Sequence, residues 1–119
     1  MNKVFILLGP TASGKSKLSL KLSRDYPFEI INADLYSIYK GLNIGTAKPS
    51  DAELKITKHY LIDTIQPNIK YNVSNFCADV DSSIKIILSK NKYPLIVGGT
   101  MMYVYQLLNG LSNEYDLLE

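Results

Sequence analysis

The stretch from Gly9 to Ser16 combines the residue types and the spacing of a loop that binds phosphate. Its members fit the pattern G-x-x-x-x-G-K-[ST] and are Gly9, Pro10, Thr11, Ala12, Ser13, Gly14, Lys15 and Ser16. The glycines let the backbone turn tightly, so that consecutive N–H groups can surround an anion. Lys15 adds a positive charge, and the Ser16 hydroxyl can ligate a Mg²⁺ that bridges two phosphates. The sequence therefore predicts a polyphosphate site; the alternative is a glycine-rich turn that binds nothing.

Asp34 is the first candidate for a chemical role outside this loop. It follows the segment 28–33, which we predict to be a strand. Ligands in open α/β sheets lie beyond the carboxyl ends of the strands, so the Asp34 carboxylate should face the same crevice as the phosphate loop. There it could take a proton from a substrate. Alternatively, Asp34 only caps the turn that follows.

A second glycine-rich turn, Gly98-Gly99-Thr100, follows the predicted strand 95–97. We expect it to lie beside the first turn, where Thr100 offers a hydroxyl. Many NTPases place an Asp or Glu after a third apolar strand to hold Mg²⁺ and to position water. This strand ends without a carboxylate, which disfavours hydrolysis. We favour transfer from a phosphorylated donor to a second substrate, which Asp34 deprotonates from the end of the strand adjacent to the phosphate loop.

The predicted elements that position these residues alternate between strands and helices. The apolar run 4–8 is typical of a central parallel strand, and 15–24 should form a helix whose N-terminus faces the phosphates. A longer helix that opens at Ser74 should pack on the sheet through an apolar stripe at three- and four-residue spacing. The stripe comprises Val73, Phe76, Cys77, Val80, Ile84, Ile87 and Leu88.

Weaker patterns cover the remaining segments. A short helix could span 51–58, a further helix is expected over 101–108 with Gly110 at its end, and residues 111–119 show no clear pattern. His59 has no second histidine nearby, so we expect a hydrogen-bonded structural residue rather than a metal ligand.

Length and composition bound the class of protein. A chain of 119 residues suits one domain, and a net charge of +2 permits an RNA or nucleotide partner without arguing for one. The longest uninterrupted apolar run, 4–8, is far too short to cross a membrane. The single cysteine, Cys77, excludes an internal disulfide and is expected in the core. We therefore expect a cytoplasmic protein.

Several motifs, in order and at their spacing, resemble the N-terminal part of bacterial tRNA dimethylallyltransferases, the isopentenyltransferases of tRNA modification. They are GPTASGKS, NADLYSIYKGLNIGTAKP, HYLID, YNVSNF and PLIVGGTMMYVYQLLNGL. The resemblance implies a P-loop NTPase-like parallel α/β sheet with flanking helices. That fold would be incomplete here, because the family's helical insertion and C-terminal strands have no counterpart in this chain.

The resemblance also implies a reaction and a set of site residues. A dimethylallyl group would pass from dimethylallyl diphosphate to the exocyclic amine of the adenosine just 3′ of the anticodon in tRNA. The segment from Thr11 to Ser16 would hold the diphosphate with Mg²⁺, Asp34 would accept the proton, and Thr100 would lie at the reaction centre. Contacts to the tRNA would come from Asp34, Leu35, Tyr36, Ser37 and Thr100.

The sequence departs from the family where Leu35 and Ser37 replace a common Ser and Gln, so the resemblance alone does not fix whether these two side chains contact the base. Other functions remain open: prenylation of free adenine nucleotide, phosphorylation by a P-loop kinase of small molecules, or a non-catalytic remnant of the transferase. We expect a monomer that acts on the anticodon loop of tRNA and does not bind membranes.

Overall fold

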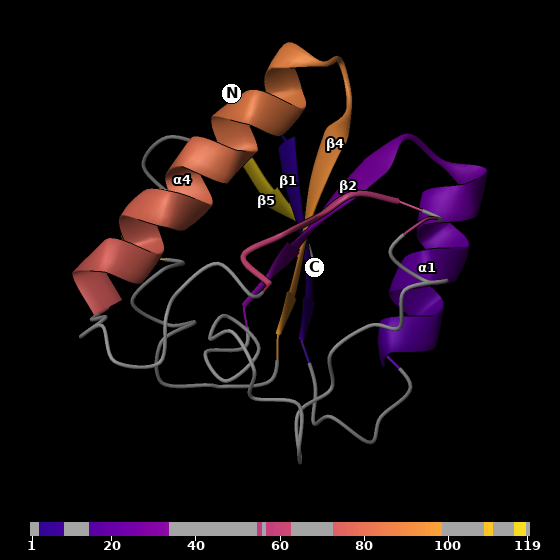
Figure 1. The fold of residues 1–119 in the computed structure, drawn as a ribbon, viewed down its shortest axis with the longest axis horizontal. Coiled ribbons are helices and arrows are strands. Elements are labelled where there is room, and N and C mark those ends of the chain that lie inside the picture. Colours follow the sequence, from indigo (N-terminus) through magenta and orange to yellow (C-terminus); the bar gives the residue numbers. More distant parts are fainter. Residues whose placement is uncertain are drawn as a thin grey trace.

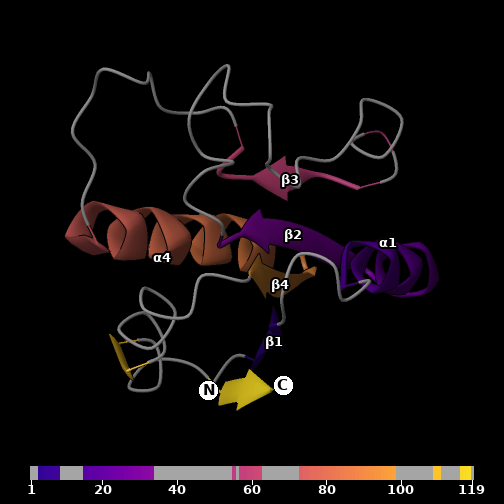
Figure 2. The same cartoon turned by 90° about the horizontal axis from the view of Figure 1, so that it is seen from below.

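The computed structural model describes residues 3–8, 15–33, 55, 57–62, 73–98, 109–110 and 116–118 of the chain. These residues form a five-stranded sheet in the order β3-β2-β4-β1-β5, and each pair of neighbouring strands is parallel. Figure 2 shows this order from one edge of the sheet to the other. The strands are β1 (Lys3–Leu8), β2 (Phe28–Asn32), β3 (His59–Tyr60), β4 (Tyr93–Gly98) and β5 (Asp116–Leu118).

Helices cover both faces of the sheet. Helix α1 (Lys15–Asp25) lies on one face and helix α4 (Val73–Ser89) on the other (Figure 1). This arrangement explains why the central strands are apolar at nearly every position, since each face must be shielded from water. Parallel strands need such crossovers, because a tight turn cannot connect them.

The larger half of the core lies under α4. The helix stripe predicted from the sequence is confirmed, because Phe76, Val80, Ile84 and Ile87 are each fully buried. Cys77 packs against this cluster, as predicted, and burial raises the pKa of its thiol. The four fully buried side chains hold α4 on the sheet; burying each contributes roughly 1.5–3 kcal/mol. The same cluster contains four strand residues, Val4, Ile6, Ile31 and Ile96, together with Ala33 and Leu61, which directly follow β2 and β3.

A smaller core lies under α1. Phe28, Ile30, Leu95 and Val97 are buried there, and the half-buried Leu22 of α1 packs against them. The alternation between the two faces follows from the pleat, in which successive side chains of a strand point to opposite sides. Side chains of β1 divide in the same way between the two clusters.

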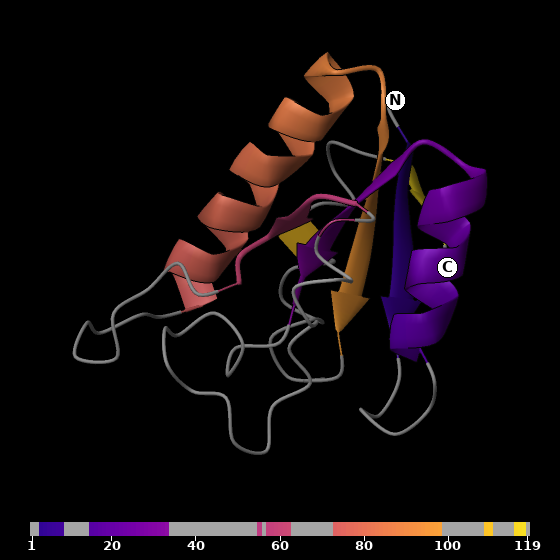
Figure 3. The ribbon, with the colours of Figure 1, turned by 45° about the vertical axis from the view of Figure 1, so that its right-hand side comes forward.

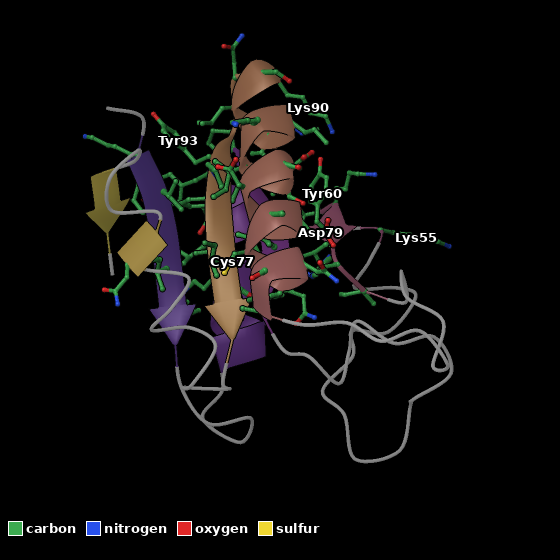
Figure 4. The ribbon with its side chains drawn as sticks, turned by 90° about the vertical axis from the view of Figure 1, so that its left-hand side faces the viewer. Lys55, Tyr60, Cys77, Asp79, Lys90 and Tyr93 are labelled. Atoms are coloured by element: carbon green, nitrogen blue, oxygen red, sulfur yellow. The ribbon has the colours of Figure 1, made fainter. Side chains whose placement is uncertain are left out.

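The amino ends of β2 and β4 meet in a charged cluster that contains Glu29, Tyr60, Lys90 and Lys92. The buried Glu29 carboxylate accepts hydrogen bonds from Tyr60 Oη at 2.7 Å, Lys90 Nζ at 3.2 Å and Lys92 Nζ at 3.3 Å. Figure 4 shows Lys90 at the C-terminal end of α4 and Tyr60 beside the helix. Lys90 and Lys92, which follow α4, therefore neutralise a buried charge.

The turn after α4 explains how both lysines reach Glu29. The Lys92 N–H donates to Ile87 O at 3.3 Å and the Asn91 N–H donates to Leu88 O at 3.0 Å, the bonds of a Schellman motif. Asn91 has φ of 59°, the left-handed conformation that this motif requires. Because asparagine tolerates this conformation, the helix ends sharply, and the lysines on either side of Asn91 turn toward the sheet.

The structure differs from the sequence-based predictions, or covers them only in part, in three segments of the chain. Residues 111–119 do contain a regular element, since β5 pairs with β1 in parallel through Val4 and Leu117. A strand of three residues is too short to show a periodic pattern. Thr57 and Lys58 lie outside any helix, so the short helix predicted over 51–58 does not reach them. Asn109 and Gly110 are helical, while the helix predicted over 101–108 lies outside the described residues.

Candidate functional site

The strand order places a topological switch point between β1 and β4. The chain leaves β1 toward β2 on one side and leaves β4 toward β5 on the other side. In parallel α/β sheets, adjacent strands whose connections run toward opposite edges of the sheet open a crevice beyond their carboxyl ends, and ligands bind there. Figure 3 shows β1 and β4 side by side with their carboxyl ends at the same edge, where α1 also begins.

The register brings three segments out of the sheet at one level. Leu8 pairs with Gly98 across β1 and β4, so Gly9 and Gly99 follow the same rung of the ladder. On the other side of β4, Asn32 pairs with Val97, and the Ala33 N–H donates to Val97 O at 2.8 Å. Asp34 is the next residue of the chain. The starts of the phosphate loop, the second glycine turn and the Asp34 segment therefore share one edge.

Strand β4, which leads to the second glycine-rich turn, lies beside β1, although Gly99 and Thr100 of that turn lie outside the described residues. The predicted placement of β2 beside β1 is wrong. Strand β4 lies between them. Neighbouring strands are about 4.8 Å apart, so the ends of β1 and β2 lie about 10 Å apart. Strand order depends on how the crossovers pack, which the local pattern of each strand does not reveal. Strand β4, which ends at Gly98, therefore separates β1, which leads to the phosphate loop, from β2, which leads to Asp34.

Gly98 and Ala33 approach each other unusually closely. A Cβ placed on Gly98 would lie 2.7 Å from Ala33 Cβ, 3.0 Å from Ala33 O and 3.2 Å from Ala33 C. Both residues are buried. Only glycine leaves room for this contact. In the sequence, a glycine at the end of a strand indicated a turn and did not reveal the tight contact with another strand.

The other side of β2 is tied to the end of β3. Asn32 Nδ2 donates to Leu61 O at 3.0 Å, and Leu61 has φ of 64°. Further back along the strands, Thr57 Oγ1 donates to Phe28 O at 2.9 Å. These bonds hold the short edge strand β3 on the sheet. The end of β2 is therefore held from both sides, by β4 through Ala33 and by β3 through Asn32.

Most of the predicted site residues lie outside the described part of the chain. This applies to Gly9, Pro10, Thr11, Ala12, Ser13, Gly14, Asp34, Leu35, Tyr36, Ser37 and Thr100. Lys15 and Ser16 open α1, as predicted, so they occupy its first turn directly after the loop segment. The structure therefore places the strand ends that carry the site, while the roles of these side chains stay predictions.

The titratable cluster of the described residues lies at the opposite edge of the sheet. Burial alone would raise the pKa of Glu29, but hydrogen bonds from Tyr60, Lys90 and Lys92 outweigh it and hold the pKa below its ordinary value of 4.5. Burial, together with the bond to Glu29, raises the pKa of Tyr60. Because Glu29 stands at the amino end of β2, this cluster supports the fold rather than the crevice.

His59 is hydrogen-bonded, as predicted, since its Nδ1 lies 3.1 Å from Thr57 O. Within the described ranges, no group of His, Cys, Asp or Glu is arranged to hold a metal ion. The same residues include no helix that is both long and apolar enough to cross a membrane. The proposed Mg²⁺ ligand, the Ser16 hydroxyl, lies on a side chain outside the described set.

Comparison with known proteins points to one family. The family model described as IPP transferase matches residues 37–117. The chain is 47% identical over 116 residues to the tRNA dimethylallyltransferase of Coxiella burnetii (strain Dugway 5J108-111), covering 95% of this chain and 37% of that protein. The chain thus spans little more than a third of this relative.

Solved structures agree with the sequence comparison. The tRNA delta(2)-isopentenylpyrophosphate transferase of Staphylococcus epidermidis matches with a TM-score of 0.84 and 36% identity, over 90% of this chain and 35% of that one. A eukaryotic dimethylallyltransferase, described as acting on tRNA, matches with a TM-score of 0.84 and 31% identity, over 91% of this chain and 27% of that one. The predicted α/β fold is confirmed, as a part of the longer fold of these enzymes. With the family model, the relatives and the fold in agreement, the chain belongs to the IPP transferase family.

Proposed function

We propose that the protein carrying this chain transfers a dimethylallyl group from dimethylallyl diphosphate to the exocyclic amine of the adenosine just 3′ of the anticodon in tRNA. The observation that carries the proposal is the common level at which β1, β2 and β4 end, with Leu8 opposite Gly98 and Ala33 bonded to Val97. Family membership and the names of the matched enzymes support the same reaction.

The separation of the strand ends suits a reaction between two substrates. The diphosphate would bind over the end of β1, on the segment from Thr11 to Ser16, whereas Asp34 would act about 10 Å away, beyond the end of β2. The acceptor amine and the allylic carbon would then meet over β4, close to Thr100. A strand without a carboxylate at its end occupies the position next to β1, which agrees with transfer rather than hydrolysis.

The proposed step forms one bond and breaks another. The amine nitrogen attacks the allylic carbon, the carbon–oxygen bond to the diphosphate breaks, and its electron pair leaves with the diphosphate oxygen. The amine proton goes to the Asp34 carboxylate. The loop amides and Lys15 stabilise the negative charge that grows on the leaving group. A Mg²⁺ ion, held in part by Ser16, would supply further charge neutralisation when bound.

The acceptor adenine must leave its stack to reach this crevice. An exocyclic amine inside a stacked loop is not accessible, so the base is extruded before reaction. The segment Asp34, Leu35, Tyr36, Ser37 and the residue Thr100 are the proposed contacts to the extruded base and its neighbours. We further propose that the protein works as a monomer in the cytoplasm.

The test compares three acceptors with the complete product of the reading frame that encodes residues 1–119. With labelled dimethylallyl diphosphate and undermodified tRNA, label should appear on the adenosine 3′ of the anticodon. Label on free AMP instead would identify an adenylate prenyltransferase. Phosphorylation of a small molecule by ATP, with no use of the allylic donor, would identify a kinase and refute the proposal.

A further inference from the structure

We propose that Gly98 is a positioning residue for the transfer, because its missing side chain sets where the Asp34 segment leaves the sheet. This inference rests on the proposed function of Asp34 and extends it to a residue on another strand. The three nearest atoms that a Cβ on Gly98 would meet all belong to Ala33. Gly98 would act through the backbone of Ala33.

The atoms that a side chain at Gly98 would meet include backbone atoms of Ala33. Besides the Ala33 Cβ at 2.7 Å, a methyl group on Gly98 would meet Ala33 O at 3.0 Å and Ala33 C at 3.2 Å. Ala33 C and O belong to the peptide bond that joins Ala33 to Asp34. Unlike the end of a flexible side chain, these atoms cannot move without moving the chain that carries the proposed proton acceptor.

The surroundings leave the end of β2 little freedom to yield. Ala33 is fully buried, its N–H is bonded to Val97 O at 2.8 Å, and the preceding Asn32 is bonded to Leu61 O at 3.0 Å. An added methyl on Gly98 must open the contact with Ala33 Cβ from 2.7 Å to at least 3.4 Å, a movement of about 0.7 Å. That movement would be passed to residue 34.

The expected effect falls on turnover and not on donor binding. Displacing a reactive group by about 1 Å can lower a rate by about 100-fold. The phosphate-loop segment leaves β1, and the added methyl group would make none of its three short contacts with β1. We therefore expect Gly98→Ala to lower kcat for prenyl transfer by about 10- to 100-fold and to leave the KM for dimethylallyl diphosphate nearly unchanged.

Two further variants separate positioning from a loss of stability. Ala33→Gly combined with Gly98→Ala removes the 2.7 Å contact and keeps only the two backbone contacts, so part of the lost kcat should return. Gly110→Ala is the matched control, because a Cβ on Gly110 would meet nothing within 4 Å. This control should keep the kcat and the KM of the parent.

The experiment measures kcat, donor KM and thermal unfolding for the complete protein and these variants, with tRNA as acceptor. A selective fall in kcat for Gly98→Ala, with partial rescue by Ala33→Gly, supports the inference. Unchanged kcat in folded Gly98→Ala would overturn it, as would a fall in kcat that Ala33→Gly does not relieve at all. If the parent itself transfers no prenyl group, the proposed function fails first, and the inference fails with it.

Discussion

The charged cluster at the amino end of β2 allows a quantitative test of the fold. We predict that Glu29→Gln lowers the free energy of unfolding at pH 7 by about 1–2 kcal/mol. Hydrogen bonds to a charged group contribute about 1.5–3 kcal/mol and neutral ones about 0.5–1.5 kcal/mol, so removing the charge costs roughly the difference. A larger loss is not expected, because the side chains of Lys90 and Lys92 are 40% and 44% exposed and can turn to water.

The effect of Glu29→Gln should also depend on pH. The pKa of Glu29 is lowered in the folded protein, so its carboxylate contributes fully above its ordinary value of 4.5, and the contribution is lost as the pH falls through the lowered pKa. Glutamine does not titrate. The difference in stability between the parent and Glu29→Gln should therefore shrink when the pH is lowered from 7 to 3.

Urea unfolding followed by circular dichroism at several pH values measures this difference. Asp81→Asn is the control, since the Asp81–Lys85 pair on α4 has a distance of 2.9 Å but the lysine side chain is 66% exposed. Such a surface pair contributes about 0.5 kcal/mol or less. If Glu29→Gln were as stable as the parent at pH 7, or if its deficit did not change with pH, the assigned role of the cluster would be refuted.

Two further predictions concern α4 and its end. Ile84→Ala should lower the free energy of unfolding by about 2–5 kcal/mol, because Ile84 is fully buried. Ile86→Ala is the control and should cost far less, because that side chain is 48% exposed. Similar losses for the two variants in urea unfolding would argue against the packing of α4. Asn91 has a φ of 59°, so Asn91→Val should lower the free energy of unfolding by about 1–2 kcal/mol, whereas Asn91→Gly should be neutral or stabilising. Equal melting temperatures for the two variants would contradict the left-handed turn.

The elements with a strong local pattern could be predicted from the sequence. Strand β1 follows from its continuous apolar run, the helix after the phosphate loop from its position behind that loop, and α4 from the periodicity of its apolar stripe. The observed α4 begins at Val73, one residue before the predicted Ser74. The short strand β5 could not be predicted, because Asp116–Leu118 gains its structure from pairing with β1 rather than from its own pattern.

Contacts between strands were the part that the sequence could not provide. Glu29 sits within the apolar run of β2, a signal that a charged partner must lie nearby, but its partners Tyr60, Lys90 and Lys92 come from distant segments. The position of β4 between β1 and β2 is likewise a property of the assembled sheet. In the sequence, Gly98 indicated only a turn. Its close contact with Ala33 follows from the position of β4 beside β2 in the assembled sheet.

In the reaction that we propose, Asp34 accepts a proton from an acceptor that meets the allylic donor over the end of β4. Its most direct test is Asp34→Ala in the complete protein, with single-turnover transfer of labelled dimethylallyl to tRNA and the affinity for the donor measured together. We predict a fall in the transfer rate of at least about 100-fold with an unchanged donor affinity. A variant that transfers the prenyl group at the parental rate would contradict the account.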